Sequence, residues 1–350
     1  MCMQTIYDLT LKQMQEMLEA HGQKAYRAKQ IFSWLYRKRV SSFDEMSDLP
    51  KSFIEQLKQE YSIEPLKEIQ RQVSHDGTIK FLAELQDGSS VELVLMHFQY
   101  GDSLCVTSQV GCNMGCSFCA SGLLKKQRDL TAGEIVGEVM FVQKQLDKEG
   151  RRVDNIVVMG TGEPFDNYTN VMNFCSIVNS DLGLAIGSRH ITISTCGIVP
   201  KIREFAQGHY QYNLAISLHA PTNELRRKLM PIAKAYPLDE LMQALREYSE
   251  DNHRRLTFEY ILLHDVNDSD EMAITLANLV RGMNAYINLI PYNQVDENGY
   301  IGVDDKKALH FYDILMKHGV KATLRQKHGD DIDAACGQLR AKHERNKQSS

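Results

Sequence analysis

The chain has 350 residues, of which 43% are hydrophobic and 24% are charged, and its formal net charge is −5. A chain of this length can bury one large core and a small accessory domain, so this composition excludes a disordered protein. No segment approaches the roughly 18 apolar residues of a membrane helix, and the N-terminus lacks the apolar core of a signal peptide. We therefore expect a cytoplasmic protein. Because the net charge is negative, any contact with nucleic acid must come from local basic patches.

The first sixty residues show the apolar periodicity that is typical of helices. One expected helix runs from Leu11 to about Gly22, a second passes through Trp34, and a third opens at Pro50. Glycine after a helix and proline at its start are common boundary signals. We assign residues 1–62 to a small helical accessory domain.

A β-hairpin is expected next. Asp87-Gly88 separates the run GTIKFLAELQ from the run SSVELVLM. An Asp-Gly pair between alternating or apolar runs favours a tight hairpin turn. We therefore assign residues 63–102 to a linker with a hairpin that joins two domains.

From residue 103 onward, strand and helix patterns alternate. The strand-like runs are LCVTSQ, DNIVV, HITIST, NLAISLH, LTFEYILL and INLIPYN, and a helical run follows each of them. Six such units predict an α/β fold with a partial (β/α)6 barrel, similar to a TIM barrel, over residues 103–330. Residues 331–350 form a C-terminal segment with a polar end.

The first loop of the expected barrel is long. Thr131 and Glu134 have the spacing of a capping box, which places the start of the first helix and the end of the loop that begins at Gly111. In folds of this kind, functional loops lie at the carboxyl ends of the strands. Residues in this loop are therefore candidates for the active site.

Three of the eight cysteines lie in this loop. Cys112, Cys116 and Cys119 have the spacing C-x3-C-x2-C. In a reducing compartment such thiols are ligands, catalysts or core residues rather than disulfides. Three thiolates can hold three irons of a four-iron cluster and leave the fourth iron open to a small molecule. The alternative is a structural zinc site, completed by Cys105 or a distant histidine.

The cysteine loop resembles the signature of the radical S-adenosylmethionine superfamily, in which an aromatic residue, here Phe118, precedes the last cysteine. The resemblance implies one [4Fe-4S] cluster with Cys112, Cys116 and Cys119 as ligands and with its open iron bound to S-adenosylmethionine. Cleavage of this cofactor then gives a 5′-deoxyadenosyl radical. Residues at successive strand ends match the cofactor contacts of the superfamily: Gly162, Glu163, Ser194, Ser217, Leu218, His219 and Asn293.

Two further cysteines indicate a branch of this superfamily. Cys105 precedes the cluster loop, and Cys336 lies in GDDIDAACGQL near the C-terminus. Both match the paired cysteines of the radical adenine methyltransferases of ribosomal and transfer RNA, and the resemblance runs from about Tyr7 to Arg340. It implies methylation of carbon 2 of an adenosine in 23S rRNA and of the adenosine 3′ to the anticodon in tRNAs.

The resemblance also implies a mechanism. Carbon 2 of adenine offers no nucleophile, so Cys336 is first methylated, then loses a hydrogen atom to the radical, and its carbon radical adds to adenine. Glu92 matches the proton acceptor of the family. Cys105 matches the thiol that releases the product through a transient disulfide with Cys336. The residues leave open which of Glu92 and Cys105 removes the proton from carbon 2. Each turnover uses two molecules of S-adenosylmethionine.

Three alternatives remain open on the sequence, and one of them is a different radical S-adenosylmethionine enzyme that acts on a small molecule or peptide. A sister branch methylates carbon 8 of the same rRNA adenosine; Pro164 resembles the carbon 2 branch, whereas Thr161 departs from the methionine or isoleucine familiar at its position. The alternative from another class is a zinc-stabilised RNA-binding module without catalysis. Such a module would leave Cys336 and the ordered cofactor residues unexplained.

The resemblance implies 23S rRNA and tRNA as partners, an electron donor such as flavodoxin with flavodoxin reductase, no membrane, and a monomeric enzyme. The helical domain is then expected to contact RNA. Local basic clusters are candidates for phosphate contacts: Arg37–Arg39, Lys125 with Lys126 and Arg128, Arg226–Lys228, and Arg325 with Lys327. We favour Lys125, Lys126 and Arg128, which follow the cluster loop. Cys175 is expected in the core.

Overall fold

The computed structural model describes residues 3–64, 66–295, 298–325, 331–332 and 338–348. The predicted methyl-carrying Cys336 therefore lies outside the described residues. Within those ranges, no helix is both long enough and apolar enough to cross a lipid bilayer.

The N-terminal residues form the expected helical domain. Its helices are α1 (Leu11–Ala20), α2 (Arg27–Phe32), which continues into the π-helix η2 (Ser33–Arg37), and α3 (Lys51–Glu60). Thr10 closes a capping box at the start of α1, and Pro50 is the N-cap of α3, as predicted. Two short parallel strands, β1 (Gln4–Thr5) and β2 (Tyr61–Ser62), join the two ends of this domain.

One mixed sheet dominates the described part of the chain, with the strand order β14-β13-β12-β11-β10-β9-β6-β5-β4-β3. These strands are β3 (Leu66–Val73), β4 (Ile79–Leu85), β5 (Ser90–Phe98), β6 (Gly101–Cys105), β9 (Val153–Val158), β10 (Ile191–Thr195), β11 (Asn213–Ser217), β12 (Leu256–Leu262), β13 (Ala285–Pro291) and β14 (Ala322–Leu324). Strand β6 and strands β9 to β13 pair in parallel, which confirms the six predicted barrel strands. The short β14 extends the parallel part by one strand.

The hairpin assigned to a linker belongs to the same sheet as the barrel strands. Strands β3, β4 and β5 pair antiparallel, and β5 pairs antiparallel with β6, the first barrel strand. The predicted turn is present at Asp87-Gly88, where Gly88 has a φ of 81°. The sheet therefore continues across the boundary expected at residue 102, because the apolar residues of β4 and β5 are buried on it.

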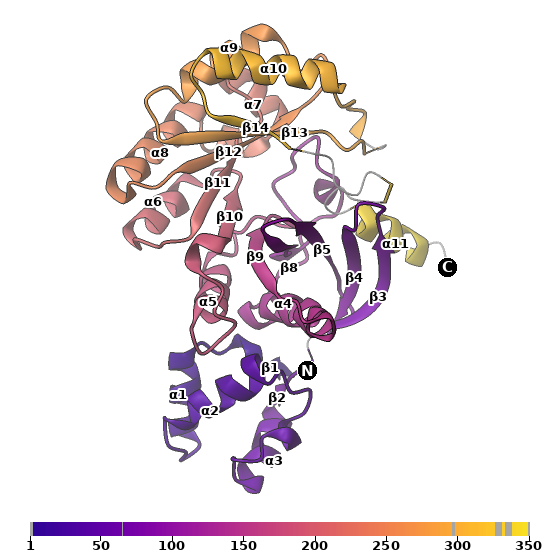
Figure 1. Cartoon of the computed structure of the whole chain (residues 1–350), viewed down its shortest axis with the longest axis vertical. Coiled ribbons are helices and arrows are strands. Elements are labelled where there is room, and N and C mark those ends of the chain that lie inside the picture. Colours follow the sequence, from indigo (N-terminus) through magenta and orange to yellow (C-terminus); the bar gives the residue numbers. More distant parts are fainter. Residues whose placement is uncertain (1–2, 65, 296–297, 326–330, 333–337, 349–350) are drawn as a thin grey trace.

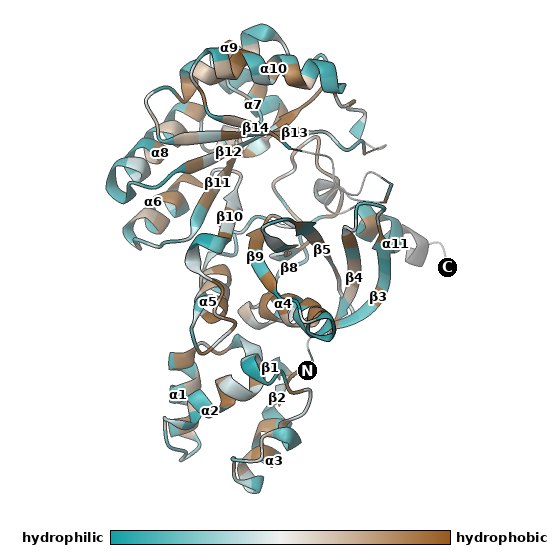
Figure 2. Cartoon of the chain, in the orientation of Figure 1, coloured by the Kyte–Doolittle hydropathy of each residue, from teal (hydrophilic) through white to brown (hydrophobic). Residues whose placement is uncertain are grey.

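Helices cover the outer side of the curved sheet (Figure 1). They are α4 (Ala132–Leu146), α5 (Tyr168–Asn179), α6 (Val199–Gln207), α7 (Asn223–Leu229), α8 (Leu238–Asn252), α9 (Asp270–Leu279) and α10 (Asp305–Lys317). The C-terminal helix α11 (Gln338–Gln348) lies on the other side of the molecule, beside β3 to β5 (Figure 1). Figure 2 shows hydrophobic residues concentrated in α4, β9 and β4, as expected for elements buried in a common core.

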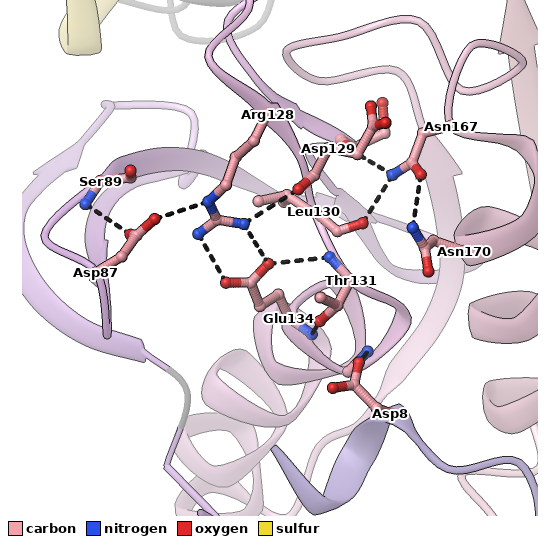
Figure 3. Close-up of polar contacts among 12 residues, drawn as sticks. Asp8, Asp87, Ser89, Arg128, Asp129, Leu130, Thr131, Glu134, Asn167 and Asn170 are labelled. Carbon is pink, nitrogen blue, oxygen red and sulfur yellow. Dashed lines mark hydrogen bonds and ion pairs between the residues drawn. The ribbon is translucent and has the colours of Figure 1, made fainter. Parts of the chain in front are cut away.

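The helical domain is fixed to the first barrel helix. A short 3-10 helix, η1 (Ile6–Asp8), packs against α4, and Asp8 accepts a hydrogen bond from the backbone N–H of Gly133 at 2.7 Å. Thr131 and Glu134 form the predicted capping box at the same helix end (Figure 3). Burial raises the pKa of Asp8, while hydrogen bonds from Thr131 and Gly133 oppose that rise. The N-terminus of α4 is thus the junction between the domains.

Candidate active site

A cavity of about 350 Å³ opens on the inner side of the sheet, in the size range of small-molecule sites. The three cluster cysteines contribute to its wall, as do the loops after successive parallel strands. Ten of the thirteen residues predicted for the site line this cavity: Cys105, Cys112, Cys116, Cys119, Gly162, Glu163, Ser194, Ser217, His219 and Asn293. Glu92 and Leu218 are described but are not among the lining residues.

The cysteine loop is shaped by backbone hydrogen bonds at the end of the small strand β7 (Gln109–Val110). The N–H of Cys112 donates to Leu124 O, and the N–H of Cys119 donates to Cys116 O at 3.2 Å. Burial raises the pKa of the Cys112 thiol to about 11, and burial with repulsion from Cys119 and Cys112 raises that of Cys116 still more. Three thiolates held close together require a compensating positive charge, which the irons of an iron–sulfur cluster would provide.

Six cysteines belong to the described residues, and none of these six is in a disulfide: Cys105, Cys112, Cys116, Cys119, Cys175 and Cys196. Cys175 is fully buried in the core, as predicted. Cys196 lines the cavity, and its backbone N–H donates to Oε2 of Glu163 at 2.7 Å. In the sequence, the signal for this position in the cavity wall was that Cys196 directly follows a strand end.

The Gly160–Pro164 loop passes close to the β6–β7 connection. Gly162 has a φ of +114°, and a Cβ there would lie 2.6 Å from Oγ of Ser108, so a side chain at this position would be both strained and blocked. Glu163 accepts from Phe165 N–H at 3.0 Å as well as from Cys196. Burial raises its pKa, while these backbone donors oppose the rise. Thr161, which departs from the family pattern, contacts Oγ of Ser121 through its hydroxyl at 3.3 Å.

The serines and histidine predicted as cofactor contacts meet at the ends of β10 and β11. The hydroxyls of Ser194 and Ser217 lie 3.3 Å apart. His219 packs edge-on against the ring of Phe118, with the ring centroids 4.9 Å apart, and this contact joins the cysteine loop to β11. Burial and the nearby Arg226 lower the pKa of His219 to about 3. The ring is therefore neutral at pH 7, and its Nδ1 accepts from the N–H of Ile261.

Leu218 lies behind the cavity wall. Its side chain is fully buried, its N–H donates to Glu259 O, and its carbonyl accepts from Ala220 N–H. These bonds fix the bend that turns His219 toward the cavity with a φ of +56°. The predicted cofactor contact of Leu218 is not tested by this geometry and stays a prediction.

The sequence analysis missed an acidic residue in the cavity wall. Glu259 on β12 lines the cavity, and its carboxylate accepts a hydrogen bond from the side chain of Asn288 at 2.8 Å. Burial raises its pKa to about 7, against the opposing effects of Arg325 and Asn288. A glutamate within the otherwise apolar run LTFEYILL was the signal that could have found it. Perturbed carboxyl groups of this kind are frequent in active sites.

Glu92 and Cys105 lie on one face of the sheet. Val94 is directly opposite Cys105 in the β5–β6 pairing, and Glu92 follows two residues away on the same face of β5. Val94 and Cys105 line the cavity, whereas the Glu92 carboxylate bonds to Lys80 and to the backbone of α11. The two residues proposed for proton removal and resolution are therefore neighbours.

Several predicted phosphate contacts are engaged within the protein. Arg128 pairs with Asp87 and Glu134 at 2.7 Å each (Figure 3), and Lys126 pairs with Asp129 and Asp166. These ion pairs hold the cluster loop to the hairpin turn and to α4. Lys125 is exposed and stays a candidate for RNA contact.

Arg226 is also not a surface cation. It is fully buried, and its Nη2 donates to Cys196 O at 2.6 Å. In the N-terminal domain, Arg37 donates to Asp181 O and Arg39 pairs with Asp147. These arginines join parts of the protein to one another. Positive charges along the sequence cannot by themselves distinguish this function from phosphate binding.

Comparison with known proteins identifies the chain. A family model described as the radical SAM superfamily matches residues 106–277, and one described as a ribosomal RNA large subunit methyltransferase N-terminal domain matches residues 4–63. A "probable dual-specificity RNA methyltransferase RlmN" from Enterococcus faecalis is 56% identical over 344 residues, which cover 97% of this chain and 96% of the relative. The chain belongs to the RlmN family of dual-specificity RNA methyltransferases.

Further relatives of the RlmN family agree with this assignment. The protein of the same name from Geobacillus thermodenitrificans is 57% identical over 338 residues, covering 97% of this chain and 93% of the relative. The crystal structure of a radical SAM methyltransferase from Sphaerobacter thermophilus matches with a TM-score of 0.92 at 42% identity, covering 96% of this chain and 98% of that one. The chain is thus a radical SAM enzyme that methylates RNA, which excludes the zinc-stabilised module without catalysis.

Proposed function

We propose that this enzyme methylates carbon 2 of an adenosine in the peptidyl transferase centre of 23S rRNA and of the adenosine 3′ to the anticodon in tRNAs, through a methylated Cys336. The observation that carries this proposal is the shared cavity, in which Cys105 lies with the three cysteines of the cluster motif. The relatives named as dual-specificity RNA methyltransferases support both RNA substrates. The three cysteines of the motif suffice as cluster ligands, so a fourth cysteine in the wall, Cys105, fits a second thiol chemistry.

Cys112, Cys116 and Cys119 fit the ligands of one [4Fe-4S] cluster. All three line one cavity, and burial raises the thiol pKa of Cys112 and of Cys116. The bound cluster and S-adenosylmethionine supply a radical that removes a hydrogen atom from a methyl group. The chain contributes the ligand thiols, an enclosed cavity and the residues that orient the cofactor.

Gly162, Glu163, Ser194, Ser217 and Asn293 are the proposed contacts of S-adenosylmethionine. The glycine gives the backbone close approach, the buried Glu163 carboxyl offers an acceptor for an ammonium group, and the paired serine hydroxyls can both donate and accept. His219, neutral through burial, presents its Nε2 without adding a charge near the cluster. We expect two cofactor molecules per turnover, one for Cys336 and one for the radical.

The product-forming steps fall to Cys336, Cys105 and Glu92. We assign to Cys336 the transient methyl group and the covalent link to adenine. To Cys105 we assign the role of the thiol that forms a transient disulfide with Cys336 and so releases the methylated base. Glu92 or Cys105 accepts the proton from carbon 2, and both lie on the cavity side of the β4–β6 sheet.

The same proposal includes the cellular context. We expect a cytoplasmic monomer that receives electrons from a donor such as flavodoxin with flavodoxin reductase. A target adenine must leave its stack to reach the cavity, since an enzyme cannot act on an atom inside a helix. The exposed Lys125, which follows the cluster loop, is the proposed contact with the RNA backbone beside the cavity.

Mass spectrometry of Cys336 peptides from cells, together with nucleoside analysis of rRNA and tRNA from a deletion strain, tests the proposal. A methylated Cys336 and loss of 2-methyladenosine from both RNAs are expected. Loss of 8-methyladenosine instead would assign the enzyme to the sister branch. An unmodified Cys336 with unchanged 2-methyladenosine in the deletion strain would contradict the proposal.

A further inference from the structure

Lys80 and Glu92 form a buried ion pair on the β4–β5 hairpin. The Nζ of Lys80 lies 3.1 Å from Oε2 of Glu92, and the two side chains are 0% and 4% exposed. Lys80 is directly opposite Val94, two residues from Glu92, so both charged groups lie on the face of the sheet that includes the cavity wall. Removal of either residue would leave the other as a buried charge without its partner, which is strongly unfavourable.

The second oxygen of Glu92 bonds to the C-terminal helix. Its Oε1 accepts the backbone N–H of Arg340 at 2.5 Å. Helix α11 begins at Gln338, and the first N–H groups of a helix have no partner within the helix. Glu92 therefore caps α11 from a strand that is 248 residues away in the chain. A carboxylate at a helix N-terminus is also favoured by the helix dipole.

Other contacts hold the chain on both sides of Cys336. Ser90, which shares the sheet face of Glu92, donates its hydroxyl to Glu344 at 2.7 Å in α11. On the other side of Cys336, Asp331 accepts from the hydroxyl of Ser74 and from the backbone N–H of His75 in the turn before β4. Helix α11 also packs against β5 and against the 3-10 helix η4 (Ala120–Leu123), which follows the last cluster cysteine. Figure 1 shows α11 beside β3 to β5.

We propose that Lys80 and Glu92 are positioning residues that anchor α11, the helix that follows Cys336 in the chain, and thereby favour methylation of that cysteine. Asp331 and Arg340 lie five and four residues from Cys336 along the chain, so anchors at both ends restrict where this cysteine can reach. Lys80 acts through Glu92, by holding its carboxylate in place toward the helix end. This inference rests on the proposed role of Cys336.

The anchor differs from the role of Glu92 as a base. A base is needed after adenine has been attacked, whereas an anchor is needed already for the methylation of Cys336, before RNA is involved. Among the described residues, the cavity lining includes Val94 and Cys105 but not Glu92, which supports a bond to α11 as the resting state of this carboxylate. The two roles therefore predict different defects.

The test uses the full-length holoenzyme and three variants: Lys80→Met, Glu92→Ala, and the double variant Lys80→Met with Glu92→Gln. Hydrogen exchange of residues 338–344 and the methylated fraction of Cys336 are measured in each. We expect both single variants to speed exchange in α11 about tenfold or more and to lower Cys336 methylation by a similar factor. The double variant replaces the ion pair by neutral groups of similar size, and its glutamine can still accept from Arg340. It should regain most of the protection of α11.

Lys201→Met is the matched control, since it breaks the exposed pair with Glu204 on α6 and should leave α11 unchanged. If a single variant unfolds, Ser90→Ala removes only the bond to Glu344 and should speed exchange in α11 by about threefold. Unchanged α11 exchange and unchanged Cys336 methylation in Lys80→Met and Glu92→Ala would overturn the anchor. An unmethylated Cys336 in the wild type would contradict the proposed function instead, and the exchange measurement would still decide the anchor.

Discussion

At the scale of single residues, burial sets the protonation of the groups around the cavity. Glu163, Glu259, Cys112 and Cys116 have raised pKa values because they are buried, while burial lowers the pKa of His219. Burial therefore opposes charge on each of these groups. A cavity of this kind is suited to a cluster and a cofactor that bring their own charges.

Glu259 gives a pH-dependent prediction at this scale. Its pKa is about 7 in the folded protein, above the ordinary value of 4.5, so the folded state keeps a proton that the unfolded chain has lost. The free energy of unfolding must then fall as the pH rises from about 5 to about 8, by about 3 kcal/mol for this group. Glu259→Gln should remove this part of the pH dependence, and urea unfolding of both proteins over this range measures it. A constant difference between the two proteins across the range would contradict the assignment.

At the scale of elements, the N-terminus of α4 joins three parts of the protein. Thr131 and Glu134 cap the helix, Arg128 links Glu134 to the hairpin turn at Asp87, and Asp8 of the helical domain bonds to the same helix end. Figure 3 shows these contacts converging on one turn of backbone. The cluster loop ends at this turn, so the cap also fixes the end of the loop.

Removal of the Thr131 hydroxyl should therefore destabilise the whole junction at the start of α4 and not only the first turn of the helix. We expect Thr131→Ala to lower the free energy of unfolding by about 1 to 2 kcal/mol, because the N–H of Glu134 loses its acceptor. Thr131→Ser keeps the hydroxyl and should stay within about 0.5 kcal/mol of the wild type. Urea unfolding measures both variants. Equal losses in the serine and alanine variants would show that the methyl group, not the cap, is responsible.

At the scale of the whole molecule, the helical domain packs against the barrel so closely at Gly133 that a Cβ atom has no space there. A Cβ at this position would lie 2.4 Å from the backbone N of Asp8 and 2.4 Å from Cγ2 of Thr5. Alanine favours a helix over glycine by about 1 kcal/mol, so the local effect and the packing effect have opposite signs. The close contact decides which of them dominates.

We expect Gly133→Ala to displace the N-terminal domain from α4. Hydrogen exchange should rise in residues 4–8, while exchange in the barrel strands should stay unchanged, and affinity for RNA should fall because the two domains no longer present one surface. Gly150→Ala is the control: a Cβ there would meet nothing within 4 Å, but the φ of +67° strains the backbone, so this variant loses stability away from the junction and should leave residues 4–8 protected. Unchanged exchange with a gain in stability would show that the junction can adjust.

The sequence by itself indicated a radical SAM enzyme that methylates RNA and predicted most of its elements. The cysteine spacing, the Thr131–Glu134 cap and the Asp87-Gly88 turn are local patterns, and local patterns depend on neighbours along the chain. Six barrel strands followed from the alternation of apolar runs.

Only the tertiary structure decided those features that depend on residues distant in the sequence. It joined the hairpin to the barrel sheet, buried Arg226, and engaged Arg128 and Lys126 with carboxylates that no charge pattern identifies. It also brought Glu259 into the cavity wall and Glu92 to the end of a helix 248 residues away. Burial and long-range pairing set the free energy of a charged group, and neither is encoded in the spacing of its neighbours.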